Sequence, residues 1–400
     1  MVAATDVARA QNPNQFGGQA RADAASQLIV FSVERALDSL PTLSGQAVSY
    51  EFDPRTDAFV RSTRLGPTVL PTSQVVAPGS IALQMAASYF TLCESFEPIN
   101  YLFTRDDLPT DPIVAKVGLD VNARVTLLSL TATYGLTRYA ELGLSLPISI
   151  IDAEAQQVFS TRRALLDLPA RNAVISGARV QDGDIAAAID TLDAGLAPGQ
   201  PLALRRDSFD ALGFDFNDGT HVGVGRITLS GKGRLWSHRD LQLAAAGDLL
   251  LPSPSEAEFA GPDSVAIYPR LVATLKVVDA IRVIGDLGYS YDVDYAELRR
   301  FAWLLGASVG NERAAFDLGF GGSEFAESLQ WTPDVVRGFP ATSGVALDDT
   351  GTGTSLVNIL VGGKILVATT TVLAGGLSVP IVNPAFQPDV LGTVAVEYTF

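Results

Sequence analysis

The residues that could support hydrolytic chemistry are few in this sequence and poorly placed for it. The only histidines are His221, at the start of a predicted strand, and His238, in a predicted tight turn. Ser230 falls on the same predicted strand as His221 but on its opposite face, because side chains alternate along a strand. A serine nucleophile needs its base within hydrogen-bonding distance. We therefore name no catalytic residue and expect that the protein is not an enzyme.

Metal and cofactor motifs are also missing from the sequence. There is no zinc-protease helix motif, no nucleophile elbow and no phosphate-binding loop. Two histidines and the single Cys93 cannot supply a four-ligand His/Cys zinc site. The acidic runs at 215–218 and 348–349 could hold a divalent ion between loops, but such runs are usually solvated. We expect no cofactor and no metal.

The composition restricts the classes of fold and partner. Hydrophobic residues make up 47% of the chain and charged residues only 18%, which excludes a disordered chain or a coiled coil. The 36 glycines and 22 prolines are too many for a helical bundle. The formal net charge of −16 argues against a nucleic-acid partner, because the surface would repel phosphate.

Elements able to position side chains emerge from the alternation of apolar and polar residues. In residues 140–151 every second residue is aliphatic, and the residues between them are mostly polar or small. A period of two is typical of a strand whose faces meet different environments. The same pattern marks twelve segments: 81–91, 114–134, 140–151, 221–235, 240–251, 264–278, 281–292, 298–309, 314–323, 354–365, 370–380 and 389–400.

The connections between these segments alternate in length. The gap after every second segment is a few residues, whereas most of the others are longer. Outer-membrane barrels have this connectivity, with tight periplasmic turns and long outer loops. We therefore predict an all-β fold, a transmembrane antiparallel up-and-down β-barrel of twelve strands over residues 80–400. Its long outer loops would be 92–113, 152–220 and 324–353.

Charged residues within the predicted strands fall on the polar face of each strand. That face would be the lumen, since a charge facing lipid at mid-membrane costs about 2 to 4 kcal/mol for Arg or Lys. The candidate lumen-lining residues are Lys116, Asp120, Arg124, Arg226, Lys232, Arg234, Arg270, Lys276, Arg282, Asp286, Arg300, Asp317, Lys364 and Glu397. The acidity of the chain belongs mainly to its predicted loops.

The first 79 residues form a segment separate from the barrel, periplasmic or lumenal. Residues 23–40 have apolar residues at helical spacing and end before Pro41, which predicts a short amphipathic helix on the rim or inside the lumen. Residues 47–63 predict a small hairpin around Asp53 and Pro54. If that hairpin joined the barrel, the strand count would be fourteen.

The last strand resembles the closing strand of bacterial outer-membrane proteins. Tyr398 and Phe400 end an alternating apolar stripe, and in such proteins this stripe is the membrane-insertion signal read by the barrel-assembly machinery. The resemblance implies a mature outer-membrane protein, in contact with outer-membrane lipid, whose signal peptide is absent from this sequence.

The stretch TYGLTRYAELGLSLPI at 133–148 is similar to a motif of the bacterial outer-membrane family of MetA-pathway phenol-degradation transporters. The strand-turn-strand rhythm continues at 223–253, and the resemblance covers residues 80–400. It implies a passive outer-membrane channel for small solutes, aromatic or hydrophobic compounds among them. The alternative is a closed barrel that acts as a scaffold or anchor, with a protein partner in a cell-envelope assembly.

Overall fold

The computed structural model describes most of the strands and part of the N-terminal segment. The described residues are 29–30, 33–36, 50–53, 56, 58–61, 65–103, 113–162, 218–253, 261–326, 331–333, 345–347, 354–382, 388 and 390–400.

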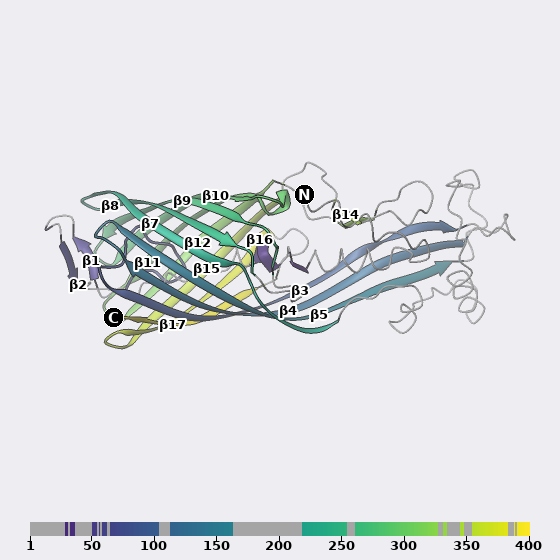
Figure 1. Ribbon diagram of the computed structural model, residues 1–400, viewed down its shortest axis with the longest axis horizontal. Coiled ribbons are helices and arrows are strands. Elements are labelled where there is room, and N and C mark those ends of the chain that lie inside the picture. Colours follow the sequence, from purple (N-terminus) through teal and green to yellow (C-terminus); the bar gives the residue numbers. More distant parts are fainter. Residues whose placement is uncertain are drawn as a thin grey trace.

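The main element is a closed antiparallel barrel of twelve strands (Figure 1), which confirms the predicted fold. The strands are β3 (Ile81–Phe103), β4 (Ile113–Gly135), β5 (Ala140–Arg162), β7 (Ile227–His238), β8 (Leu241–Leu251), β9 (Ala266–Val278), β10 (Ile281–Asp292), β11 (Arg300–Gly310), β12 (Ala314–Phe325), β15 (Thr354–Ala368), β16 (Thr371–Val382) and β17 (Leu391–Thr399). β17 pairs with β3, and β4 pairs with β5, so the sheet closes on itself. Tight turns join strands at one end, which we call the turn end; the other is the loop end.

Five shorter strands and one 3-10 helix are also described. β6 (Gly219–Val224) pairs with β5 beyond the part of β5 that pairs with β7. β1 (Tyr50–Asp53) and β2 (Ala58–Arg61) form a separate two-stranded sheet, so the fourteen-strand alternative is wrong. A second small hairpin, β13 (Trp331–Pro333) with β14 (Val345–Leu347), lies within the expected loop 324–353. The helix η6 (Ala296–Leu298) connects β10 to β11.

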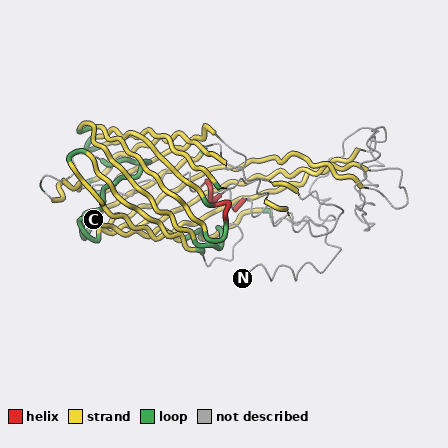
Figure 2. The backbone as a smooth tube through the Cα atoms, turned by 90° about the horizontal axis from the view of Figure 1, so that it is seen from above, coloured by secondary structure: helices red, strands yellow, loops and turns green. Residues whose placement is uncertain are grey.

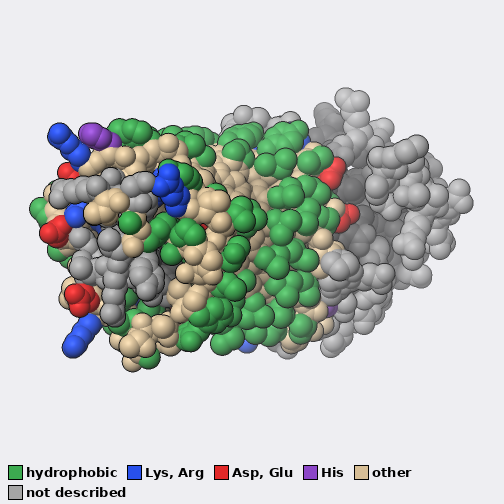
Figure 3. Space-filling view, turned by 60° about the vertical axis from the view of Figure 1, so that its left-hand side comes forward, with side chains coloured by type: hydrophobic (Ala, Val, Ile, Leu, Met, Phe, Trp, Pro, Cys, Tyr) green, Lys and Arg blue, Asp and Glu red, His purple; other side chains and the backbone are tan. Residues whose placement is uncertain are grey.

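The outer surface of the barrel is an apolar belt. Along β17 the outward Val394 is 61% exposed, whereas the inward Glu397 is 0% exposed. Figure 3 shows apolar side chains covering the barrel wall, with charged side chains toward its ends. This is the surface that a transmembrane barrel presents to lipid. Among the described residues, no helix is both long and apolar enough to span a bilayer.

Strands β3, β4 and β5 are each 23 residues long and project beyond the other strands at the loop end (Figures 1 and 2). Most of the expected outer loop 92–113 is therefore strand, as is the beginning of the expected loop 152–220. The alternation of apolar and polar residues stops where the apolar belt ends, but the hydrogen-bonded pairing of β3, β4 and β5 continues beyond that point. A register shift between Phe96 and Ile99 accommodates Pro98, which has no N–H to donate.

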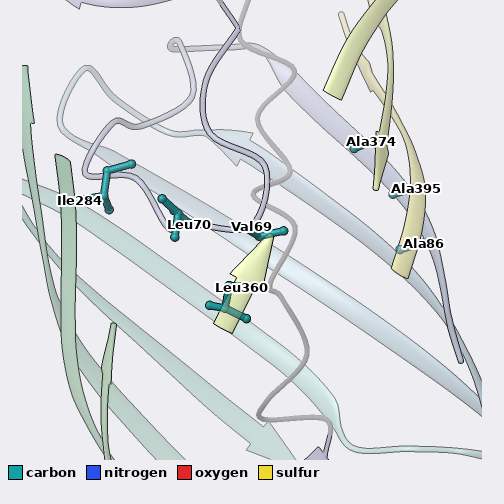
Figure 4. Close-up of a cluster of buried hydrophobic side chains, with 7 residues drawn as sticks. All are labelled: Val69, Leu70, Ala86, Ile284, Leu360, Ala374 and Ala395. Carbon is teal, nitrogen blue, oxygen red and sulfur yellow. The ribbon is translucent and has the colours of Figure 1, made fainter. Parts of the chain in front are cut away.

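The N-terminal segment enters the barrel. Residues 65–77, which we call the strap, are mostly buried, and Val69, Leu70 and Ile284 share an apolar cluster with Leu360 and the wall alanines (Figure 4). The backbone N–H of Leu65 donates to the carbonyl of Asn311 in the β11–β12 turn, so the strap starts at the turn end. It also finishes there, since the N–H of Gly79 donates to the carbonyl of Gly135.

Candidate functional site in the barrel lumen

The strap is held by acceptors on the inner wall of the barrel. The Asp317 carboxylate on β12 accepts hydrogen bonds from the backbone N–H groups of Thr68 and Val69. On β9, the hydroxyl of Thr274 accepts from the N–H of Ser73 at 3.2 Å. On β5, the Glu141 carboxylate accepts from the N–H of Val76 at 2.6 Å.

These anchors lie on opposite sides of the barrel. Passing from β12 through β11, β10, β9, β8 and β7 to β5 takes six steps around the twelve-stranded wall, which is half of its circumference. β9 lies midway along that path. The strap therefore crosses the lumen from one wall to the other, and its main-chain N–H groups donate the hydrogen bonds at these anchors.

Glycines in the wall make room for the strap. A Cβ atom built on Gly319 would lie 2.8 Å from Leu70 Cδ2, and one on Gly306 would meet the same side chain at 2.8 Å. A Cβ atom on Gly362 would lie 2.5 Å from Val69 Cγ1. At separations this short Val69 or Leu70 would have to move, so the packing of these two side chains depends on glycine at these positions.

Several ionic groups inside the barrel are paired with groups of opposite charge. Arg270 on β9 lies 2.8 Å from a carboxylate oxygen of Asp248 and 3.4 Å from one of Asp286, on the neighbouring strands β8 and β10. Lys232 lies 2.8 Å from Glu141. These pairs offset one another's charge, which is how buried charges are normally tolerated.

A second buried pair lies on the wall near the strap anchor Asp317. Lys364 on β15 and Glu397 on β17 are separated by 3.7 Å, and the Gln84 amide donates to Glu397 at 3.1 Å. Both charged side chains are fully buried. Their desolvation is tolerated because each has an ionic partner.

The loop end of the lumen contacts another described part of the N-terminal segment, the helical residues before β1. Residues 29–30 and 33–36 are helical, and the rest of the predicted helix 23–40 lies outside the described residues. Arg226 ion-pairs with Asp292 at 2.9 Å and with Glu34 at 3.5 Å. The Arg35 guanidinium lies 4.1 Å from the ring centroid of Phe325, the last residue of β12.

Most of the predicted lumen residues face inward in the structure. Those on the inner face are Arg226, Lys232, Arg234, Arg270, Lys276, Arg282, Asp286, Arg300, Asp317, Lys364 and Glu397, with Lys276 at the turn-end rim beside Asp279. The side chains of Lys116 and Asp120 lie outside the described residues. Whether the inward residues line a conducting path stays a prediction.

Arg124 does not face the lumen, contrary to the prediction. Its side chain is 73% exposed and shares a face of β4 with the outward residues Leu128 and Leu130. It pairs with Asp152 of β5 at 3.9 Å. Because β4 continues past the apolar belt, an outward charge at this height meets water instead of lipid, and the rule against outward charge no longer applies.

Several residues at this site were not identified from the sequence. Asp248, Glu141 and Thr274 lie on the polar parity of predicted strands, so the alternation that identified the other lumen residues could have included them. The strap itself lacks any periodic pattern. Its anchoring to Asp317 depends on tertiary contacts that no local signal reveals.

The remaining polar candidates do not assemble into a catalytic or metal site among the described residues. His238 stacks on Trp236 at the β7–β8 turn, with ring centroids 5.8 Å apart. No group of three or more His, Cys, Asp or Glu side chains in the described ranges is arranged to hold a metal ion. Of the two acidic runs, only Asp218 is described.

The closing strand has the expected orientation. Tyr398 and Phe400 are both exposed on the outer face, with their ring centroids 5.0 Å apart. The N–H of Ile81 donates to the carbonyl of Phe400, and the N–H of Phe400 donates back to Ile81, at the seam between β17 and β3. Their role as an insertion signal stays a prediction.

No protein-family model and no curated protein matches this chain. Solved structures resemble it at low identity. An outer-membrane channel from Pseudomonas putida F1 has 12% identity, covers 82% of this chain and 99% of its own, and gives a TM-score of 0.43. The toluene transporter TodX of P. putida has 10% identity, with 81% and 90% covered and a TM-score of 0.37. The translocator domain of the autotransporter NalP from Neisseria meningitidis has 9% identity, with 81% and 90% covered and a TM-score of 0.33. These values are too low to support a functional assignment.

Proposed function

We propose that this chain is a passive channel of the bacterial outer membrane for small solutes, aromatic or hydrophobic compounds among them, closed by the strap. The observation that carries the proposal is the anchoring of residues 65–77 to opposite walls of the barrel. A barrel that served only as a membrane anchor would need no separate segment fixed across its lumen.

The nature of the anchors supports a segment that can leave. The strap is held by hydrogen bonds at four separated points and by the packing of Leu65, Val69 and Leu70, not by a continuous sheet. A hydrogen bond contributes only about 0.5 to 1.5 kcal/mol to the net stability of a protein. Replacing these few contacts with water is a small change compared with unfolding the barrel.

Location and partners follow from the same proposal. The mature chain would sit in outer-membrane lipid through its apolar belt, after removal of a signal peptide. The barrel-assembly machinery would recognise the closing strand with Tyr398 and Phe400, whose rings face outward at the seam. The strap and the β1–β2 hairpin would then face the periplasm, because tight turns mark that side of such barrels.

Planar-bilayer recording tests the channel. We expect low or intermittent conductance from the full chain and a larger, stable conductance from a variant that lacks residues 1–78. A variant that lacks residues 1–64 keeps the strap and is the matched control. The absence of conductance from the variant without residues 1–78, when it has folded and inserted, would exclude a channel.

The alternative is a closed barrel that anchors a cell-envelope assembly. The projecting β3–β5 sheet favours it, because beyond Tyr89 the described residues of β3 pair only with β4. An unpaired strand edge is a surface on which another chain can add a strand. Recovery of a stoichiometric partner by crosslinking at Cys93, which is exposed on β3, would support this function; a single-component barrel would count against it.

A further inference from the structure

A patch of the inner wall beneath the strap combines a glycine floor with apolar sides. The floor consists of Gly306 on β11, Gly319 and Gly321 on β12, and Gly362 on β15. Strand register places Gly306 opposite Gly319, and Gly319 opposite Leu360. Leu304, Leu360 and Ile284 lie beside this floor. We call the patch the glycine seat.

The strap covers only part of the glycine seat. Val69 and Leu70 lie against Gly362, Gly319 and Gly306, as the short Cβ distances show. The nearest side-chain atoms to a Cβ on Gly321 are instead the wall's own Leu360 Cδ1 at 3.5 Å and Leu304 Cδ1 at 3.9 Å. The floor therefore continues beyond the two strap side chains.

Two polar atoms around the seat are buried without a hydrogen-bond partner among the described residues. They are Asn358 Oδ1 and Ser378 Oγ. Register ties each to the seat, since Asn358 pairs with Gly321 and Ser378 with Leu360. Both side chains are more than nine-tenths buried. Because folded proteins satisfy nearly all buried polar groups, an unsatisfied amide oxygen and a hydroxyl point to a ligand with a hydrogen-bonding group, and a donor on the ligand can serve either of them.

We propose that the glycine seat binds a small neutral compound with an apolar ring and one O–H or N–H donor, and that Val69 and Leu70 occupy part of the seat while the channel is closed. The flat floor suits a ring, because glycines allow a planar group to approach the backbone. The donor is directed to Asn358 or Ser378, and the Asp317 carboxylate excludes anions. The inference rests on the proposed function and specifies its solute class.

The strap presents the same chemistry to the seat as the proposed ligand. Leu70 supplies an apolar group over Gly306 and Gly319, and the Thr68 and Val69 N–H groups supply donors to Asp317. The ligand and the strap therefore compete for overlapping space. Binding of the ligand favours the state in which the strap has left, because a ligand shifts an equilibrium toward the state that binds it better.

Calorimetric titration of the purified full chain in detergent tests the seat. The variant Leu70→Ala empties the space over Gly306 and Gly319, much as a truncated core leucine leaves a cavity that binds small apolar molecules. The probes are benzyl alcohol, toluene and benzoate, which share a ring and differ in the attached group. We expect benzyl alcohol to bind Leu70→Ala about tenfold more tightly than toluene, the effect of one additional hydrogen bond, and benzoate not to bind. The wild-type chain should bind benzyl alcohol more weakly than Leu70→Ala.

Second substitutions in the Leu70→Ala background locate the binding. Adding Gly319→Leu refills the floor and should abolish binding of benzyl alcohol, whereas adding Gly247→Ala should not, because a Cβ there meets nothing within 4 Å. Adding Asn358→Val, which removes the amide oxygen but changes the side-chain volume less than Gly319→Leu does, should remove the preference for benzyl alcohol over toluene. Equal affinities for the two probes in Leu70→Ala, or binding that persists with Gly319→Leu, would overturn the inference.

The test is independent of conductance. If benzyl alcohol binds as expected and the variant without residues 1–78 conducts nothing, the seat stands and the channel does not. If that variant conducts but no probe binds Leu70→Ala, the channel stands and the seat is wrong. Heat-modifiable migration on a gel, measured for each variant, shows that the barrel has folded before either result is interpreted.

Discussion

The carboxylate of Asp317 accepts a 2.9 Å hydrogen bond from the backbone N–H of Val69, a residue 248 positions earlier in the chain. The donor belongs to a segment with no regular structure, and the acceptor belongs to the inner face of the wall. This contact fixes the strap at one of its two ends in the lumen. The stability of the closed state should therefore depend on Asp317.

We expect Asp317→Asn to open the channel more often. The substitution keeps the shape of the side chain but removes its charge, so the one oxygen that accepts from both Thr68 and Val69 becomes a weaker, neutral acceptor. Hydrogen bonds to a charged group contribute about 1.5 to 3 kcal/mol, compared with about 0.5 to 1.5 kcal/mol for neutral ones. Single-channel recording should show a higher open probability than the wild-type chain. The control is Asp240→Asn in the exposed β7–β8 turn, which should leave the open probability unchanged.

The fit between Gly362 and Val69 can be tested by paired substitutions. Gly362→Ala places a Cβ in contact with Val69 and should displace the strap, raising conductance. Val69→Ala removes the clashing methyl groups, so the double variant should return toward wild-type conductance. The interaction energy from such a cycle between contacting residues is typically about 0.5 to 3 kcal/mol. Purely additive effects would show that the two residues do not contact.

Replacing Arg270, which pairs with Asp248 and Asp286, should lower the thermal stability of the barrel. Arg270→Met leaves two buried carboxylates without their partner, and breaking a buried pair in this way costs about 3 to 5 kcal/mol. The temperature at which the folded form disappears from heat-modifiable gels should fall. Adding Asp248→Asn and Asp286→Asn removes the two unpaired carboxylates and should restore most of the lost thermal stability. A single variant as stable as the wild-type chain would contradict the pairing.

The outward faces of two strands should differ in their tolerance of charge. Leu287 lies outward on β10, so Leu287→Arg should destabilise the folded barrel by about 2 to 4 kcal/mol if it lies at mid-membrane. Arg124 is also outward but beyond the apolar belt, and Arg124→Leu should have little effect. Folding into lipid vesicles, titrated with urea, measures both. Stabilisation of the barrel by Arg124→Leu, comparable in size to the cost of Leu287→Arg, would mean that the belt does not end below Arg124.

The strands of the barrel wall were predictable because the alternation of apolar and polar side chains can be seen within each strand's own sequence. Leu142 and Leu144 alternate with polar residues along one strand, and the two environments of a barrel wall require that pattern. The same rule failed for Arg124, because nothing in the sequence marks the height at which lipid gives way to water. It also missed the outer part of β3, where pairing with β4 needs no apolar face.

The site was less predictable than the wall. Asp317 was identified as an inward residue, but its contact with Val69 depends on the path of an irregular segment across the lumen. Gly319 appeared in the sequence as one of many strand glycines. Gly319 differs from a glycine such as Gly247, which has open space beside it, only because the fold places Leu70 against Gly319.

The strap runs directly into β3, and β3 is the strand that seals the barrel against β17. The seam joins the first and final strands of the wall, at a point connected covalently to the segment inside. Once it has formed, residues 65–77 could enter the lumen only through an end of the barrel. A strap that lay against the wall before the seam closed would be enclosed without threading.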